Sequence, residues 1–292
     1  MTERENTKRR RTEEGFVQDD KLLSIKNKHA RDDAIFFRVD DHKYLNCVSG
    51  KEDQKLTSAS TFVGQFFEPF VVDKVIAQMH ASPKWTQSEY YPMTSDEIKA
   101  QWDSGRDLGT DLHDVIERYL NDEPPTSEQR EKVDFQQFLD FEAEWLHDRD
   151  VVVYRTEWRI YDEDSGLSGT LDWICAYTDQ ADPDVLRMML LDHKRSKEIK
   201  IKDKWKKRGL RCCSDVYATN YYKYGLALNL YKYILEKNYH DVVHAGKTYK
   251  RVHVDDMYLN VMHPVHETYQ VFQIPDMQPK IQEMLLDKNE NQ

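Results

Sequence analysis

Asp192 and Lys194 end an apolar segment of the chain and are the residues best suited to chemistry. Residues 186–191 are apolar apart from Arg187, which predicts a buried strand that carries Asp192 out of the core. Because residues i and i+2 of a strand point to the same face, Asp192 and Lys194 should project together. A carboxylate beside a lysine suits a hard cation and the water that the cation activates.

Asp172 is a second carboxylate in an apolar setting, the segment from Leu171 to Ala176, where a lone charge would be costly. If its strand pairs with the next one, Asp172 lies beside Asp192. Together with Lys194 they predict a Mg²⁺ or Mn²⁺ site that polarises a phosphate, with the lysine orienting or deprotonating a water. The pattern D-x-K alone is usually a surface ion pair, so the prediction depends on the burial of both carboxylates.

Three motifs in one order resemble a known family. GTLD at residues 169–172 and LLDHKRS at residues 190–196 resemble the core of the PD-(D/E)XK nucleases, closest to their RecB-like, exonuclease-type branch. That branch places G-x-x-D and D-x-K-x-S on successive strands, with a histidine metal ligand on an earlier helix. Residues 109–117 match the helical G-x-x-x-H pattern with His113. A single histidine there would more often be a surface residue, and the motif order favours a ligand.

The resemblance implies roles for these residues. His113, Asp172 and Asp192 would bind the metal, the main-chain carbonyl of His193 would be a further ligand, and Lys194 would assist the attacking water. A histidine ligand favours Mn²⁺ more than an all-oxygen site would.

Weaker matches extend the resemblance over roughly residues 57–262. Glu157 stands upstream of the G-x-x-D motif, where the family often has a glutamate near the metal or the DNA, although a plain strand-surface glutamate is an equal alternative. Ser58 and Ser60 precede an aromatic helix, as does the polar motif that opens many such nucleases, and would contact nucleic acid.

A helical Q-x-x-x-Y motif of the family is only half present. Tyr231 stands at its tyrosine, but Ala227 replaces the glutamine, which puts substrate positioning in doubt. Tyr224 or Asn229 could compensate.

Residues 194–211 (KRSKEIKIKDKWKKRGLR) hold the densest positive charge in an acidic chain, directly after Lys194. Cations there would follow phosphates, and Trp205 would stack on a base. The alternative is a solvated, partly disordered loop. The expected nucleic-acid contacts are Arg195, Ser196, Lys197, Lys200, Trp205, Lys206, Lys207 and Arg208.

The elements that must position these residues follow from hydrophobic periodicity. We expect strands at 35–48, 151–161, 169–178, 186–194 and 250–262, and helices at 62–79 (interrupted near Pro69), from 94, at 112–120, 135–146, 217–237 and 276–287. Ser58 or Ser60 should cap the first helix, and residues 94–97 form a capping box. Gly105 and Gly109 flank a short segment before the helix at 112.

The predicted fold class is α/β (α+β). It has a restriction-endonuclease-like core, a central mixed sheet of four to five strands flanked by helices, with a helical N-terminal elaboration. Residues 1–20 read as a disordered tail, and residues 21–292 as a single nuclease domain. Within it, the elaboration spans about 57–104, the catalytic core about 105–263 and the C-terminal helix about 276–287.

Composition narrows the function. A formal net charge of −11 and a pI near 5.5 disfavour a protein that coats nucleic acid, but not a local basic groove. No apolar run suits a membrane span, and no secretory signal is seen. The basic run Lys8, Arg9, Arg10 and Arg11 is a candidate nuclear localisation signal or a solvated tail.

The cysteines predict a reducing, intracellular compartment and no zinc site. Some RecB-like relatives bind an iron–sulfur cluster through one N-terminal and three C-terminal cysteines; that spacing is missing here, so no cluster is expected. The four are Cys47, Cys175, Cys212 and Cys213.

The expected function is metal-dependent hydrolysis of DNA, by an exonuclease acting on ends or single strands in replication, recombination or repair. Alternatives are an RNA nuclease, a catalytically impaired nucleic-acid-binding module, and a hydrolase of small phosphoesters, which the basic segment disfavours. No G-x-x-x-x-G-K-[ST] loop is present, so a helicase or recombination partner would be a separate protein.

Overall fold

The structure is a computed structural model that describes residues 16–17, 20–38, 41, 43–46, 48, 54–179, 181–204 and 206–290. Most of the disordered tail expected over residues 1–20, with its basic run, lies outside these residues, as does Trp205. Phe16 and Val17 form a short strand, which corrects the expected end of the tail. Among the described residues, no helix combines the length and apolar character that a membrane span requires.

A mixed sheet runs through the molecule. Its long strands are β5 (Val151–Asp162), β6 (Leu167–Tyr177), β7 (Val185–Arg195) and β10 (Arg251–Met262). β5, β6 and β7 pair antiparallel in sequence order, β10 lies parallel to β7, and β11 (Gln270–Gln273) pairs antiparallel with β10. The mixed α/β class and the four long strands are confirmed; β11 is short and was not expected.

The sheet is wider than the four to five strands expected, because an N-terminal meander joins it. Among the described residues, this sheet has nine strands. β4 pairs parallel with the first residues of β6, which attaches the meander. These strands have only two to five residues each, so alternation could not reveal them all. They are β1 (Phe16–Val17), β2 (Ile35–Arg38), β3 (Lys43–Asn46) and β4 (Gln54–Ser58).

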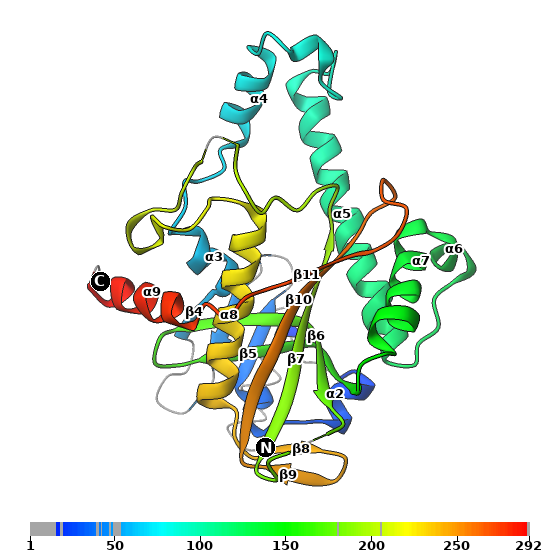
Figure 1. The fold of residues 1–292 in the computed structure, drawn as a ribbon, viewed down its shortest axis with the longest axis vertical. Helices are drawn as coiled ribbons and strands as arrows, with labels where there is room; N and C mark the ends of the chain where they lie inside the picture. Colours follow the sequence, from blue (N-terminus) through cyan, green and yellow to red (C-terminus); the bar gives the residue numbers. More distant parts are fainter. Residues whose placement is uncertain are drawn as a thin grey trace.

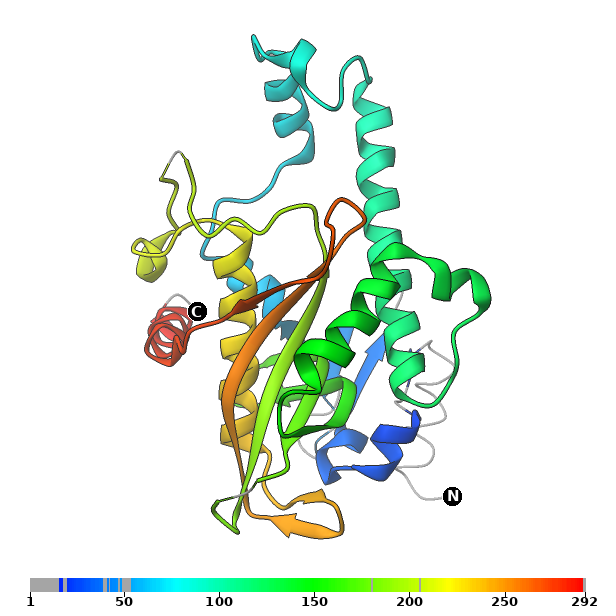
Figure 2. The ribbon, with the colours of Figure 1, turned by 45° about the vertical axis from the view of Figure 1, so that its right-hand side comes forward.

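Helices cover both faces of the sheet (Figure 1). One face carries α3 (Ala59–Gly64), α8 (Asn220–Asn238) and α9 (Gln278–Glu290). The other carries α5 (Ser95–Leu120) and α7 (Val133–Asp140), and the two helical layers stand on opposite sides of the sheet in Figure 2.

The position of β7 between the two helical layers explains why its sequence is apolar almost throughout. Met188 and Leu190 pack in the core beneath α8, whereas Met189 and Leu191 pack in the core beneath α5 and α7. A strand buried on both faces shows no polar alternation. The expectation of a central, buried strand is therefore confirmed.

α5 is one continuous helix, which corrects the expected separation at Gly105 and Gly109. The capping box of Thr94 and Glu97 is confirmed at its start. Two glycines in a helix interior cost about 1 kcal/mol each. The buried side chains before and after them, Ile98 and Leu112, anchor the helix on both sides of the weak segment.

The first half of α5 extends beyond the sheet together with α4 (Val72–His80) and η2 (Trp85–Gln87), as Figures 1 and 2 show at the top. We call residues 69–108 the arm. α3 ends at Gly64, before Pro69, and α4 begins at Val72, so the expected interruption is confirmed.

Several smaller elements complete the described residues. The helix expected at 135–146 continues from α7 as the π-helix η3 (Phe141–Leu146), and α6 (Ser127–Glu131) precedes it. A hairpin that the sequence did not suggest follows α8. The remaining elements are α2 (Leu22–Lys26), η1 (Ala30–Ala34), η4 (Arg211–Cys213), β8 (Val242–His244) and β9 (Lys247–Tyr249).

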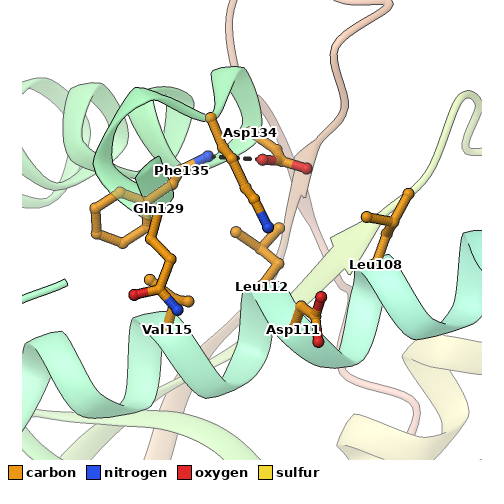
Figure 3. A pocket seen from close by; sticks show the side chains of 8 residues that line it. Leu108, Asp111, Leu112, Val115, Gln129, Asp134 and Phe135 are labelled. Atoms are coloured by element: carbon orange, nitrogen blue, oxygen red, sulfur yellow. Dashed lines mark hydrogen bonds between the residues drawn. The ribbon is translucent and has the colours of Figure 1, made fainter. Parts of the chain in front are cut away.

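α5 packs closely against α6 and α7. Figure 3 shows Leu112 and Val115 of α5 turned toward Gln129 and Phe135, around a crevice of about 10 Å³. That space holds about one water molecule, so it is no ligand site.

Candidate active site

β6 and β7 part at the residues that carry the two carboxylates. The strands are paired as far as Trp173 and Leu191, and the next pair would set Asp172 opposite Asp192. β4 takes the place of β7 on β6 further along. The amide of His193 points into the gap and donates to Oδ2 of Asp172 at 2.9 Å. The fold thus holds both carboxylates where the sheet opens.

Lys194 joins the two carboxylates, as the strand period predicted. Its Nζ lies 2.7 Å from Oδ2 of Asp192 and 3.8 Å from Oδ2 of Asp172. That oxygen of Asp192 is buried and has no hydrogen bond of good geometry. A buried carboxylate oxygen without a hydrogen bond is costly unless a cation completes its surroundings.

His113 reaches the gap from α5. Its Nε2 lies 2.9 Å from the main-chain carbonyl of His193. Since a carbonyl oxygen can only accept, Nε2 carries a hydrogen and donates. Its Nδ1 then faces Oδ2 of Asp172 at 3.6 Å and Oε1 of Glu157 at 3.7 Å. A metal-ligating histidine is commonly held in this way through its other nitrogen.

The carbonyl of His193, expected as a metal ligand, has two donors in this structure. It accepts from Nε2 of His113 and from Nζ of Lys194 at 3.1 Å. Both lone pairs of the oxygen are therefore engaged within the protein.

Glu157 completes the cluster from β5, directly opposite Asp172 in the register of β5 and β6. Its φ is 44°, in the left-handed region. For a residue other than glycine such a conformation costs on the order of 1–3 kcal/mol and is often found at functional sites. Of the two alternatives for Glu157, the structure places it among the site residues.

One ligand atom each from His113, Glu157 and Asp172 lies within 4.8 Å of the other two. Two carboxylates and an imidazole make a donor set suited to Mn²⁺, and to Mg²⁺ where water supplies further ligands. Asp192 lies on the Lys194 side of this group.

The charges in the gap perturb one another. Burial raises the pKa of Asp192 to about 6, against the attraction of Lys194 and with the repulsion of Asp172. Burial alone would lower the pKa of His113, but Asp172 and Glu157 outweigh it and raise the pKa to about 9. The concentration of negative charge therefore attracts a cation, whether a proton or a metal ion.

Tyr231 packs from α8 against Gly169 of β6. A Cβ at position 169 would lie within 3.0 Å of three atoms of the tyrosine ring. Burial and the neighbouring Tyr44, Asp192 and Asp172 raise the pKa of Tyr231 well above its usual value. The glycine of the first strand motif and the tyrosine of α8 are thus two sides of one contact.

The site opens into a cleft of about 1820 Å³. Its wall is formed by the arm and α5, by parts of β5, β6 and β7, and by the start of α8. Among the described residues that line it, Lys and Arg (Lys99, Arg106, Arg159, Lys194, Arg195 and Lys197) outnumber Asp and Glu (Asp103, Asp114, Glu117 and Glu157). The chain as a whole has 42 Lys and Arg against 53 Asp and Glu, so the cleft reverses the overall balance.

Three of the expected nucleic-acid contacts line this cleft: Arg195, Ser196 and Lys197. Arg195 donates to Asp134 at 2.7 Å, and Lys197 pairs with Glu89 of the arm at 2.5 Å. The other described ones lie outside its lining residues: Ser58, Ser60, Lys200, Lys206, Lys207 and Arg208. Ser58 instead caps α3, where its Oγ accepts from the amide of Thr61 at 3.2 Å.

The two residues named as substitutes for the missing glutamine differ in position. Tyr224 lines the cleft, with Nζ of Lys194 5.1 Å from its ring centroid. Asn229 is buried and bonds Gly225, Pro275 and Met277, which attaches α8 to the segment before α9. Tyr224 is therefore placed to contact a substrate and Asn229 is structural.

Sequence reasoning missed much of the cleft wall. Lys99, Trp102 and Arg106 share a face of α5 with His113. They precede His113 by 7, 11 and 14 positions, which is close to whole helical turns. That spacing would have revealed them, had the glycines not suggested a break. Tyr44 of the N-terminal meander also lines the cleft, and its Oη lies 2.8 Å from Oγ1 of Thr170.

Comparison of the chain with protein-family models found no match, and comparison with curated proteins found no significant one.

Proposed function

We propose that this protein is a metal-dependent nuclease that hydrolyses DNA phosphodiester bonds at ends or in single strands. The observation that carries the proposal is the convergence of His113, Glu157 and Asp172 beside the Asp192–Lys194 pair, where a locally basic cleft meets the parted strands. A group of acids alone would suit many roles. The adjoining lysine and the reversed charge balance of the cleft favour a polyanionic substrate.

His113, Glu157 and Asp172 would hold Mg²⁺ or Mn²⁺, with Asp192 available as a further ligand. When bound, the ion supplies a polarised phosphate and a more acidic water. The carbonyl of His193 accepts from His113 and so keeps the imidazole turned toward the two carboxylates.

Lys194 acts as a cation and not as a base in this proposal. Burial would lower its pKa, but Asp192 and Asp172 hold the pKa above its usual range. The ammonium group therefore keeps its proton. It donates a hydrogen bond to the attacking water or to a phosphate oxygen, and it stabilises the negative charge that develops on the phosphate oxygens.

Cleavage of end-labelled DNA tests the proposal. Linear single strands, linear duplexes and closed circles, with RNA in parallel, are incubated with Mg²⁺, Mn²⁺ or EDTA. We expect metal-dependent cleavage of linear DNA, and a loss of about 10²–10³-fold in kcat for Lys194→Ala. Lys250→Ala is the matched control, because the side chain of Lys250 is exposed and lies outside the cleft.

The substrates separate the alternatives. Sparing of closed circles identifies an exonuclease, and cleavage of RNA in preference to DNA changes the substrate class. If no nucleic acid is cut with either metal while binding stays tight and salt-dependent, the catalytic proposal fails and a binding module replaces it.

A further inference from the structure

The far end of the cleft is aromatic. Phe70, Tyr90 and Trp102 of the arm all line it, and Phe70 is 66% exposed. Ring centroids lie 5.8 Å apart for Phe70 and Trp102 and 6.1 Å apart for Tyr90 and Trp102. Nε1 of Trp102 donates to the Tyr90 hydroxyl at 3.0 Å, which fixes the two rings relative to each other. We call these three residues the aromatic cluster.

α5 connects the aromatic cluster to the site. Trp102 and His113 lie on this one helix, so about 16 Å of helix axis separates them. Between them Arg106 and Thr110 line the cleft, and Gly105 and Gly109 leave the helix backbone bare. A strand of stacked nucleotides would cover this distance with about five residues.

We propose that the aromatic cluster is a base-stacking platform for single-stranded nucleic acid whose backbone continues along α5 to the site. This inference rests on the proposed nuclease function and names its substrate class. In a duplex the bases stack on each other and their faces are not available, whereas unpaired bases stack on aromatic side chains regardless of sequence.

Continuity with the site selects this occupant over a protein partner. The cluster lies in the same cleft as Lys194, and Lys99 and Arg106 line the cleft on the same face of α5. Their partners Asp73 and Asp103 are well exposed. Such exposed ion pairs contribute little and exchange readily for a phosphate. Flat rings beside exchangeable cations are the features that bind a single strand.

Binding measured without turnover tests the platform. Fluorescence anisotropy of labelled 12-nucleotide single-stranded DNA, single-stranded RNA and blunt 12-base-pair DNA is followed in EDTA at one salt concentration. We expect Trp102→Leu and Phe70→Ala to weaken single-strand binding about 5- to 100-fold and leave duplex binding unchanged. Trp102→Phe keeps a ring and should retain most of the affinity.

The controls separate stacking from damage to the arm. Tyr91 is 50% exposed on the same arm but outside the cleft, so Tyr91→Ala should bind as wild type. Phe70→Ala is the decisive variant, because an exposed side chain can be removed without unfolding. Equal thermal unfolding of all variants completes the comparison.

Length dependence gives a second test. About five stacked nucleotides span the distance from the site to the aromatic cluster. The affinity of the wild type for single strands should therefore rise steeply as the strand lengthens from 4 to 8 nucleotides. This rise should be smaller in Trp102→Leu. An unchanged rise, or single-strand binding equal to wild type in Phe70→Ala and Trp102→Leu, overturns the platform.

The two proposals fail separately. If the variants that lose a ring bind single strands more weakly but the wild type cuts no nucleic acid, the platform stands and the nuclease proposal is refuted. If the wild type cuts DNA with metal but these variants bind as wild type, the nuclease proposal stands and the platform is refuted. Comparison of the DNA and RNA strands then identifies the nucleic acid.

Discussion

At the residue scale, Glu157 combines an unfavourable backbone conformation with a carboxylate at the centre of the site. Its φ of 44° suits glycine better than any residue with a Cβ. Its Oε1 nevertheless lies 3.7 Å from Nδ1 of His113. The carboxylate of Glu157 therefore reaches the site at a cost to the stability of the fold.

A comparison of Glu157→Gly with Glu157→Ala measures this strain. Glycine usually destabilises a strand relative to alanine, but here we expect Glu157→Gly to be the more stable by about 1 kcal/mol. Both variants lose the carboxylate and should lose metal affinity alike. Denaturant unfolding in EDTA gives the free energies; equal stability, or a more stable alanine variant, would refute strain at this position.

At the element scale, the contact between β6 and α8 depends on Gly169. Gly169→Ala places a methyl group against the Tyr231 ring, and we expect a loss of about 1–3 kcal/mol from overpacking. Adding Tyr231→Leu to this variant should recover part of the loss, which a double-mutant cycle measures.

Gly64→Ala is the matched control for this prediction. Gly64 lies at the end of α3, and a Cβ added there would have no heavy atom within 4 Å. It should be neutral or stabilising by up to about 1 kcal/mol. A Gly169→Ala variant as stable as wild type, with Tyr231 in place, would contradict the close approach.

The elements also show what the sequence could and could not predict. The strand carrying Asp192 was predictable, because burial on both faces leaves an apolar run and the period of two places Lys194 beside Asp192. Their approach to Asp172 followed from antiparallel pairing of successive strands. These inferences use local periodicity and adjacency along the chain, which a single sequence contains.

The rest depended on tertiary structure. α5 continues through Gly105 and Gly109 because its flanking turns are buried, and composition alone suggested a break. The pairing of β6 and β7 ends after Trp173 and Leu191, and the backbone at Glu157 has a positive φ; neither feature has a signal in the local sequence. The aromatic cluster was missed for the same reason, since Trp102 and Phe70 meet only through the folding of the arm.

At the scale of the whole molecule, buried charge links stability to pH. The side chain of Asp162, at the end of β5, is fully buried and accepts from Nζ of Lys237 on α8 at 2.9 Å. Burial would raise the pKa of Asp162, but hydrogen bonds from Ser165 and Lys237 outweigh it and lower the pKa below 3.8. This pair fastens the β5–β6 turn to the helical layer.

The sign of the pH dependence follows from the lowered pKa. The contribution of Asp162 is complete above its unfolded pKa and is lost as pH falls through the lower, folded pKa. We expect Asp162→Asn to be less stable than wild type by about 1.5–3 kcal/mol at pH 6–7. The difference should shrink below about pH 4.

Urea unfolding of both proteins from pH 3.5 to 7 measures this difference. Asp164→Asn is the control, since Asp164 contacts the same lysine but is 71% exposed. A difference that stays constant across the range would show that the lost contribution is not electrostatic.

Metal binding should also stabilise the whole fold, because His113, Glu157 and Asp172 come from different elements. A ligand at 100 times its Kd contributes about 2.7 kcal/mol. We expect Mn²⁺ to raise the Tm of the wild type by several degrees and that of Asp172→Asn much less. The asparagine oxygen can still accept from the His193 amide, so the comparison isolates the charge. Equal shifts in both proteins would place the ion elsewhere.

Because β6 and β7 part at Asp172 and Asp192, the site depends on which face of β7 each residue occupies. Insertions and deletions in β7 therefore have a predictable consequence. One residue inserted in β7 before Asp192 would reverse every later side chain. Asp192 and Lys194 would then point into the layer where Trp173 and Phe138 pack around His193. Substitutions in these strands can be absorbed by repacking, whereas a one-residue change of length cannot. Along this stretch the spacing of the motifs is therefore constrained more tightly than the identity of the residues between them.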